Sequence, residues 1–247
     1  MKIIAMIPAR YEASRFPGKL MKDLAGKTVI LRTYEATKKA NLFDEVYVVT
    51  DSAIIYNEII ANGGKAIKSK KEHESGSDRI AEAVENLDID IVVNVQGDEP
   101  LIDPLLINQV AEYLDYQKEV FVSTACHSIS DYNDFINPNN VKVVLDKNSQ
   151  ALYFSRAPIP FPRDEFTQKI IGRKGFYKHI GIYAYRAKFL KDFNRIGEAE
   201  LEDIEKLEQL RILYAGYKIG VVQSNDTPSA GVDTPEDLER VRKLFSN

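Results

Sequence analysis

Short apolar runs separated by amphipathic helical segments constrain the fold of this chain more than any other feature. Residues 3–7 form such a run and stop at Pro8, and residues 46–49 and 91–95 have the same β-branched character. Runs this short that are apolar throughout predict strands buried on both faces. Over residues 78–87 the apolar side chains instead recur at helical spacing. This alternation predicts an α/β protein with a mainly parallel sheet.

The last helix has the sharpest start signal in the sequence. Thr234 is placed as the N-cap, Pro235 as the first helical residue and Asp237 as the third, which is a variant of the capping box. The apolar residues that follow fall on one helical stripe. We therefore predict a surface helix that begins at Pro235.

The pattern changes after about residue 120. Residues 120–124, 141–145 and 151–154 predict strands without an obvious crossover helix between them, and 180–185 predict another strand. Residues 204–214 have the spacing of one helix. The stretch 155–176 is too long for an ordinary connection, which suggests a functional or interface segment.

The chain shows neither an internal repeat nor a break in composition between parts. We predict a single domain over residues 1–247, with an insertion or dimerisation region at about 150–200. Only one cysteine, Cys126, occurs in 247 residues, so an intramolecular disulfide is excluded and a reducing compartment is favoured.

The overall charge excludes one class of partner. Lysine and arginine total 33 against 37 aspartate and glutamate, a formal net charge of −4, whereas a nucleic-acid binder would show a basic excess. No apolar run approaches the roughly 20 residues of a membrane-spanning helix, and the first apolar run is too short for a signal peptide. We expect a cytoplasmic protein that binds no nucleic acid and does not insert into membranes.

Several common nucleotide and metal motifs are missing from the sequence. There is no G-x-G-x-x-G pattern, so a dinucleotide site has no support. Gly26-Lys27-Thr28 is similar to the end of a P-loop, but Met21 stands where that loop requires glycine. Three histidines and one cysteine make a structural zinc site a poor interpretation.

A cluster of cations follows the first predicted strand. Arg10, Arg15 and Lys19 lie in one short segment with Gly18. Open α/β sheets bind ligands at the carboxyl ends of their strands, and several converging cations suit a triphosphate. From the spacing alone, a solvated basic loop is an equally good interpretation.

Two carboxylates stand at comparable places. Asp98 follows the most apolar run, where Gly97 allows a close backbone approach. Asp233 precedes the last helix, where it could assist the cap or project as a second metal carboxylate. Carboxylate oxygens are the ligands that Mg²⁺ prefers. A simple turn explains Gly97-Asp98 equally well.

Two further residues have both a structural and a functional interpretation. Ser75 stands at the start of another predicted helix, where it suits either an anion site or a cap. His179 lies within a predicted strand, where a structural role is the more common one.

Taken in order, these segments resemble the 3-deoxy-manno-octulosonate (Kdo) cytidylyltransferases over nearly the whole chain. Any one block is weak evidence, but a chance match of so many in order is implausible. The blocks are Ile7-Pro8-Ala9-Arg10-Tyr11, Arg15-Phe16-Pro17-Gly18-Lys19, Asn94-Val95-Gln96-Gly97-Asp98-Glu99-Pro100, Asn140-Val141-Lys142-Val143-Val144, Ala151-Leu152-Tyr153-Phe154-Ser155-Arg156, His179-Ile180-Gly181-Ile182-Tyr183, Leu207-Glu208-Gln209-Leu210-Arg211 and Val232-Asp233-Thr234-Pro235-Glu236-Asp237-Leu238-Glu239.

The resemblance implies a fold and an activity. The fold is a Rossmann-like nucleotidyltransferase (GT-A-like) α/β fold, a mixed sheet flanked by helices with a small sheet extension at a homodimer contact. The activity joins CTP to the anomeric hydroxyl of Kdo, releasing pyrophosphate and giving CMP-Kdo for lipopolysaccharide biosynthesis. Mg²⁺ is the implied cofactor, and CTP and Kdo are the implied partners.

The resemblance also assigns site residues by motif. The implied catalytic set is Lys19, Asp98, Asp233 and Arg15, and the implied Mg²⁺ ligands are Asp98 and Asp233. The implied nucleotide-binding residues are Arg10, Arg15, Lys19, Ser75, Gly76 and Arg79. The implied sugar-binding residues are Gln96, Arg156, His179, Tyr183, Glu208 and Gln209.

Two positions depart from the family pattern, and three alternatives stay open. Ala13 replaces a common serine, which puts one hydroxyl–phosphate contact in doubt, and Leu20 replaces a common proline. A cytidylyltransferase for 8-amino-Kdo or another acid sugar would differ only in the sugar pocket. A sugar-1-phosphate nucleotidyltransferase would need a Gly-rich opening loop that this sequence lacks. A non-catalytic nucleotide-binding module would not need both carboxylates and the cation cluster.

Overall fold

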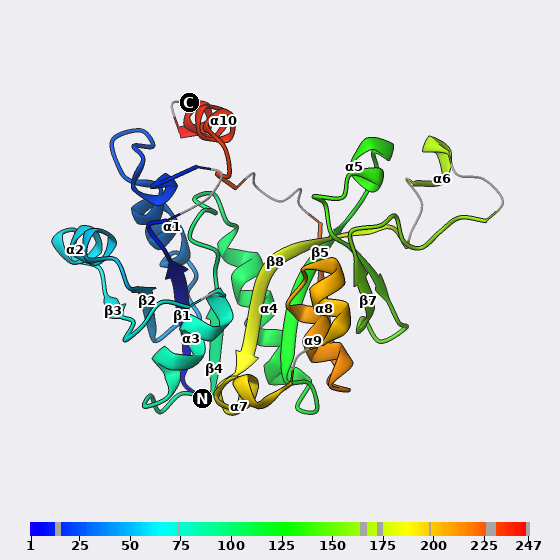
Figure 1. The fold of residues 1–247 in the computed structure, drawn as a ribbon, viewed down its shortest axis with the longest axis horizontal. Helices are drawn as coiled ribbons and strands as arrows, with labels where there is room; N and C mark the ends of the chain where they lie inside the picture. The colour runs from blue at the N-terminus through cyan, green and yellow to red at the C-terminus, as the bar shows by residue number, and fades with distance from the viewer. Residues whose placement is uncertain are drawn as a thin grey trace.

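The strands form one nine-stranded sheet in the computed structural model of the chain, which describes residues 1–12, 16–73, 75–163, 167–171, 175–197, 199–225 and 231–245 (Figure 1). The strands are β1 (Ile3–Ala9), β2 (Glu45–Thr50), β3 (Ala66–Lys68), β4 (Ile91–Asn94), β5 (Val122–Ser128), β6 (Lys142–Leu145), β7 (Ala151–Ser155), β8 (Tyr177–Arg186) and β9 (Ile219–Ser224). Their order is β3-β2-β1-β4-β8-β5-β9, and β6 pairs with both β7 and β8 beside that path.

Strand β1 is central to the parallel half of the sheet. It pairs in parallel with β2 on one side and β4 on the other. Ile3, Ala5 and Ile7 face one apolar cluster, whereas Ile4 and Met6 face a second cluster on the opposite side of the sheet. Because successive side chains of a strand point to opposite faces, a strand covered on both faces must be apolar throughout.

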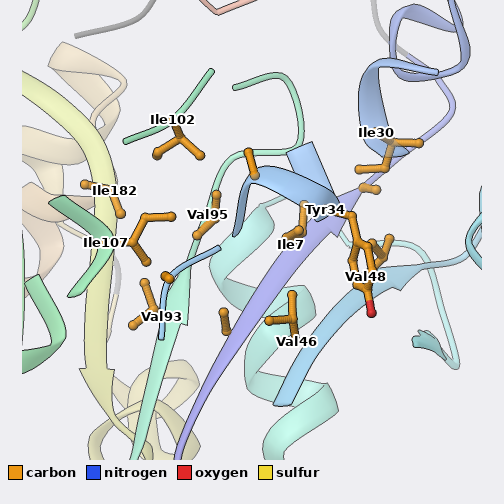
Figure 2. Close-up of a cluster of buried hydrophobic side chains, with 14 of the residues drawn as sticks. Ile7, Ile30, Tyr34, Val46, Val48, Val93, Val95, Ile102, Ile107 and Ile182 are labelled. Atoms are coloured by element: carbon orange, nitrogen blue, oxygen red, sulfur yellow. The ribbon is translucent and has the colours of Figure 1, made fainter. Parts of the chain in front are cut away.

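Helices cover both faces of the sheet. Figure 2 shows part of the first cluster, where Val93 and Val95 lie beside Ile107 and where Ile30 and Tyr34 lie on the other side of Ile7. Helices α1, α2, α4 and α10 contribute to this cluster, and α3, α7 and α9 contribute to the second. The helices are α1 (Val29–Thr37), α2 (Ala53–Ala61), α3 (Gly76–Val84), α4 (Pro104–Tyr116), α5 (Tyr132–Ile136), α6 (Gln168–Ile171), α7 (Ala187–Asp192), α8 (Glu200–Glu205), α9 (Gln209–Tyr214) and α10 (Pro235–Phe245), with 3₁₀ turns η1 (Lys19–Met21) and η2 (Phe193–Arg195).

The local predictions are confirmed where the signals were strongest. Each apolar run predicted as a strand overlaps β1, β2, β4, β5, β6, β7 or β8, although β5 begins at Val122 and not at residue 120. Helix α10 starts at Pro235, and the Thr234 hydroxyl accepts the backbone N–H of Asp237 at 3.2 Å while the Asp237 carboxylate accepts the N–H of Thr234 at 3.0 Å. This reciprocal pair is the predicted capping box.

Two predictions need correction. The single helix over 204–214 is wrong, because Lys206 has a left-handed backbone (φ 53°) that ends α8, and α9 begins only at Gln209. The mainly parallel sheet holds only for β3-β2-β1-β4 and for the β5–β9 pair. Strand β8 runs antiparallel to β4 and β5, so the whole sheet is mixed, as the family resemblance implies.

The region 150–200 does not behave as one inserted unit. Its strand β8 lies between β4 and β5 in the middle of the sheet. Strand β7 lies at the far end from β3, and α6 packs with α5 around Phe135 and Phe176 beyond it (Figure 1). Among the described residues, no helix is long and apolar enough to cross a membrane.

Candidate active site

The loop after β4 is pressed against the carboxyl end of β1. A Cβ on Gly97 would lie 3.2 Å from the carbonyl oxygen of Pro8 and 3.3 Å from Cδ1 of Ile30, so only glycine fits without a shift. The Thr33 hydroxyl donates to the carbonyl oxygen of Gly97 at 2.9 Å. These contacts fix Asp98 at the edge of the sheet where α/β proteins bind ligands.

A second segment, far away in the sequence, is held against the same loop. The backbone N–H of Val232 donates to the carbonyl oxygen of Asp98 at 2.8 Å. A Cβ on Gly231 would lie 3.2 Å from Oε1 of Glu99 and 3.4 Å from the same Asp98 oxygen. Asp237 caps α10 and also accepts the backbone N–H of Asp233 at 3.2 Å. The cap is thus made by Thr234 and Asp237 together, and the Asp233 carboxylate points to another partner.

That partner is Lys19, whose ammonium lies between the two carboxylates. Its Nζ donates to Oδ2 of Asp98 at 2.5 Å and to Oδ1 of Asp233 at 2.8 Å. Gly18 precedes it with a left-handed backbone (φ 66°) that starts η1 and turns the lysine inward. Burial alone would lower the pKa of Lys19, but the charges and hydrogen bonds of Asp98 and Asp233 outweigh it and raise that pKa. The structure therefore brings together three predicted residues around one cation position.

The pair of carboxylates fits a magnesium ion that the substrate completes. Oxygen atoms of Asp98 and Asp233 already converge on one positive charge, and both are hard ligands. In the part of the chain that the structure describes, no group of three or more His, Cys, Asp or Glu side chains is arranged around a metal position. Mg²⁺ is usually held by one or two carboxylates together with phosphate oxygens and water. The donor set therefore matches a site finished by a triphosphate.

An open cavity, which we call the outer cavity, lies beside this position. It contains four of the residues predicted to bind the nucleotide, and its lining comes from the end of β1, the start of α3 and the loop after β4. The lining residues are Pro8, Ala9, Arg10, His73, Ser75, Gly76, Arg79, Gln96 and Glu208. It shares Arg10, His73 and Arg79 with a further hollow next to Asp51 and Ser52. The result is a continuous groove with an exposed arginine at its mouth.

Two of the predicted nucleotide residues have structural partners in this groove. The Arg79 guanidinium is buried and donates to the Asp51 carboxylate at 2.5 Å. The Ser75 hydroxyl accepts the backbone N–H of Asp78 at 3.0 Å and so caps α3. The capping interpretation of Ser75 is confirmed. Ser75 satisfies only one of the backbone N–H groups at the start of α3, so other N–H groups of that first turn are still available to a ligand in the groove.

A second cavity of about 220 Å³, which we call the inner cavity, adjoins the outer one through Gly76, Gln96 and Glu208. Aromatic rings and side-chain amides share its wall, and four predicted sugar-binding residues belong to it. The lining residues are Gly76, Ser77, Asn94, Gln96, Tyr183, Tyr185, Phe193, Lys206, Leu207, Glu208, Gln209 and Ile212.

The titratable groups of the inner cavity are shifted toward their neutral forms. Burial raises the pKa of Glu208, and the neighbouring carboxylate of Asp78 raises it further, against a hydrogen bond with Ser77. Burial also raises the pKa of Tyr183 well above its usual value. A cavity lined by side-chain amides, by Glu208 and Lys206 and by two stacked tyrosine rings is suited to a polyhydroxylated ligand.

The structure places Arg156 and His179 behind the cavities. Neither is among the described residues that line them. The Arg156 guanidinium donates to the carbonyl oxygens of Glu205 at 2.7 Å and Lys206 at 3.3 Å, next to the start of α9. His179 lies against the ring of Tyr183, with centroids 5.4 Å apart, and its Nε2 is 2.9 Å from the Thr124 hydroxyl. Both side chains therefore support the wall of the inner cavity.

His179 is expected to stay neutral throughout the physiological range. Burial lowers its pKa to about 3, because a charged imidazolium would lie in an apolar setting among aromatic rings. Its imidazole resonances in two-dimensional NMR should therefore not titrate between pH 5 and pH 8. A midpoint above about pH 5.5 would contradict this expectation and would restore His179 as a cation for a sugar carboxylate.

Arg15, which is predicted to bind the nucleotide, lies outside the described residues. Sequence reasoning missed Asp51, which pairs with Arg79, and Asn94, which ends β4 inside the inner cavity. A polar residue that closes an otherwise apolar strand was the available signal for Asn94. Cys126 is buried with its pKa raised to about 12 by that burial, in agreement with its non-catalytic interpretation.

Comparison with known proteins places this geometry in a family. The cytidylyltransferase family model matches residues 4–219. Proteins named 3-deoxy-manno-octulosonate cytidylyltransferase are similar over almost the full length. The protein of Christiangramia forsetii is 56% identical, and the match covers 99% of this chain and 97% of that protein. The protein of Francisella tularensis subsp. holarctica is 51% identical, and the match covers 98% of this chain and 97% of that protein.

Solved structures agree with the sequence relatives. A CMP:2-keto-3-deoxy-manno-octonic acid synthetase complexed with CTP superposes with a TM-score of 0.93 at 39% identity, covering 100% of this chain and 99% of that one. A cytidylyltransferase from Leptospira borgpetersenii shares the fold, with a TM-score of 0.67 at 18% identity. The match covers 100% of this chain and 87% of that one. The chain therefore belongs to the cytidylyltransferase family, among the 3-deoxy-manno-octulosonate cytidylyltransferases.

Proposed function

We propose that this protein couples CTP to the anomeric hydroxyl of Kdo, forming CMP-Kdo and pyrophosphate. The observation that carries the proposal is the convergence of Lys19, Asp98 and Asp233 at the sheet edge, beside a groove that leads into a cavity for a polar ligand. The relatives named for this activity and the similar synthetase solved with CTP support the choice of both substrates.

The triphosphate is assigned to the outer cavity. Arg10 lies exposed at its mouth, and the first turn of α3 after Ser75 offers backbone N–H groups at a positive helix end. Lys19 adds a mobile positive charge on the same side. These groups offset the negative charge that develops on the departing pyrophosphate, which is the main catalytic requirement of phosphoryl and nucleotidyl transfer. Arg15 stays a predicted member of this set.

Mg²⁺ is assigned to Asp98 and Asp233. When bound, it supplies charge that stabilises phosphate oxygens and lowers the pKa of a coordinated hydroxyl. The two carboxylates provide the ligands, and the backbone contacts of Gly97 and Val232 hold them in place before the substrates arrive. We propose that Lys19 exchanges its carboxylate partners for phosphate oxygens once the ion and the nucleotide are present.

The sugar is assigned to the inner cavity. Gln96 and Glu208 line both cavities, so they stand where an anomeric hydroxyl and an α-phosphorus must meet. Gln209 and Tyr183 provide further hydrogen-bonding groups on the wall, which Arg156 and His179 support from behind. Holding both reactants in this geometry turns a bimolecular reaction into an effectively unimolecular one.

Pyrophosphate release tests the proposal directly. Each of the four nucleoside triphosphates is combined with a panel of acid sugars, including Kdo, 8-amino-Kdo and a sialic-type acid, with and without Mg²⁺. We expect release only with CTP, Kdo and Mg²⁺ together. Selective release with 8-amino-Kdo would reassign the sugar, and no release with any pair would leave a nucleotide-binding module as the function.

A homodimer is a further part of the proposal. Large apolar side chains are exposed on β7, α8 and α9, which lie together at one side of the sheet (Figure 1). Leu152 is 62% exposed, Ile204 77% and Tyr214 59%. Exposed apolar groups gathered on neighbouring elements mark interaction surfaces. A second copy of the chain is proposed to cover this surface, and a purely monomeric sedimentation profile would contradict that proposal.

The single buried cysteine agrees with a proposed cytoplasmic location.

A further inference from the structure

The inner cavity contains a buried polar group that the proposed function has not used. Asn94 is the last residue of β4, whose other three residues are isoleucine or valine. Its side chain is 2% exposed, and it lines the inner cavity between Tyr183 across the strand pair and Met6 on β1. The amide is thus built into the rigid centre of the sheet and reaches the cavity wall.

The Asn94 amide oxygen is not satisfied by the protein. Oδ1 is buried and accepts no hydrogen bond from any residue that the structure describes. A buried acceptor without a donor costs free energy, and most buried side-chain polar atoms in folded proteins have a partner. A valine or leucine would fill a position next to the second apolar cluster at no such cost.

The surroundings show which kind of donor is missing. Gln96, Gln209, Glu208 and Lys206 add polar groups around the same cavity, although none of them donates to Oδ1 of Asn94. The rings of Tyr183 and Tyr185 stack at 5.8 Å and form one wall. Amides and a carboxyl group set against aromatic faces are complementary to a sugar, whose hydroxyls donate and accept and whose C–H faces pack on rings. A nucleotide phosphate would be repelled by an acceptor oxygen.

We propose that Asn94 determines sugar specificity by accepting a hydrogen bond from one hydroxyl of the acid sugar through Oδ1. The inference rests on the proposed function, because it assigns a residue to the sugar of that reaction. The unsatisfied oxygen is then a preorganised half of a substrate contact. An acid sugar without that hydroxyl would leave the oxygen unpaired in the complex and would be rejected.

Asn94→Leu tests the assignment because leucine has a similar size without polar atoms. We expect the variant to fold with unchanged or higher melting temperature, and KM for Kdo to rise about 10- to 100-fold while KM for CTP changes less than twofold. Asn108→Leu is the matched control. Its Oδ1 on α4 is also buried without a partner in the described structure, but it lies outside the cavities and should leave KM for Kdo unchanged.

Deoxy analogues of Kdo, each lacking one hydroxyl, complete the experiment as a thermodynamic cycle in which one change is made in the protein and the other in the sugar. In the wild type, one analogue should lose about as much kcat/KM as Asn94→Leu does, and in the variant that analogue should lose nothing further. An unchanged KM for Kdo in Asn94→Leu, or equal losses for every analogue in both proteins, would overturn the proposal. A wild type inactive with Kdo would instead refute the proposed function, and the cycle is then run on the acid sugar of the panel that it does use.

Discussion

Asp98→Asn is expected to lower kcat/KM for CTP by about 100-fold or more, which is the range for losing one electrostatic contact to a reacting group. The change keeps the shape of the side chain and an oxygen that still accepts from Lys19, but it removes a full negative charge from the proposed cation site. The loss should fall mainly on kcat, because the proposed role is stronger in the transition state than in the bound substrate.

Two measurements separate a metal role from a folding defect. The Mg²⁺ concentration for half-maximal activity should rise, and CTP binding without metal, measured by calorimetry, should persist. Asp88→Asn is the control, because Asp88 is an exposed carboxylate between α3 and β4 and the variant loses the same charge. Near wild-type turnover of Asp98→Asn at limiting Mg²⁺ would remove Asp98 from the metal site.

Lys142→Met is expected to destabilise the fold by about 3 kcal/mol, because each buried carbonyl that loses its donor costs roughly 1–3 kcal/mol and the removed buried charge offsets part of that. The Lys142 ammonium is fully buried and donates to the carbonyl oxygens of Asn137 at 2.9 Å, Asn140 at 2.5 Å and Arg156 at 2.6 Å. Methionine preserves the volume, so the change isolates the polar contacts. Urea unfolding at pH 7 measures the difference.

The pH dependence gives a second test of this buried lysine. Burial lowers the pKa of Lys142 to about 8 from its usual 10.5, against the opposing charge of Glu205. Between these two pH values the folded protein has released the proton and the unfolded chain still binds it, so the stability supplied by Lys142 rises with pH across that window. The stability difference between wild type and Lys142→Met should therefore be larger at pH 9.5 than at pH 7, and a constant difference would contradict this reasoning.

The matched control for Lys142 is Lys147→Met. Lys147 is exposed in the turn between β6 and β7, and its replacement should change stability by less than about 0.5 kcal/mol.

Lys142 is also connected to the active site by hydrogen bonds. It donates to the carbonyl oxygen of Arg156, and the Arg156 guanidinium donates to the carbonyl oxygens of Glu205 and Lys206, just before the cavity residue Glu208. We therefore expect Lys142→Met to raise KM for the sugar more than KM for CTP.

Local patterns predicted the elements well because the signals are themselves local. The run 3–7 is apolar throughout because both faces of β1 are covered, and Thr234 with Asp237 makes a cap within four residues. The helix over 204–214 failed for the complementary reason. Apolar spacing continues through Lys206, but the left-handed backbone there is stabilised by contacts of α8 and α9, including the Arg211–Glu202 ion pair at 2.5 Å.

Within the candidate site, residue types were easier to predict than partners. The family motifs predict Asp98 and Asp233 as metal ligands, but their meeting at Lys19 depends on a backbone hydrogen bond from Val232 to Asp98. Arg79 was placed near the nucleotide, yet the sheet brings Asp51 to its guanidinium. Charge patterns along a chain do not show which opposite charges will be adjacent in space.

By itself the sequence determined the α/β class, the positions of every strand except β3 and β9, the last helix cap and, through its motifs, the family and its implied substrates. Tertiary structure alone decided the order of the strands in the sheet, the placement of Arg156 and His179 behind the inner cavity, and the unsatisfied Asn94 oxygen within it. The physical reason is that periodicity and capping act over a few residues. Strand order and side-chain satisfaction depend instead on which distant segments pack together.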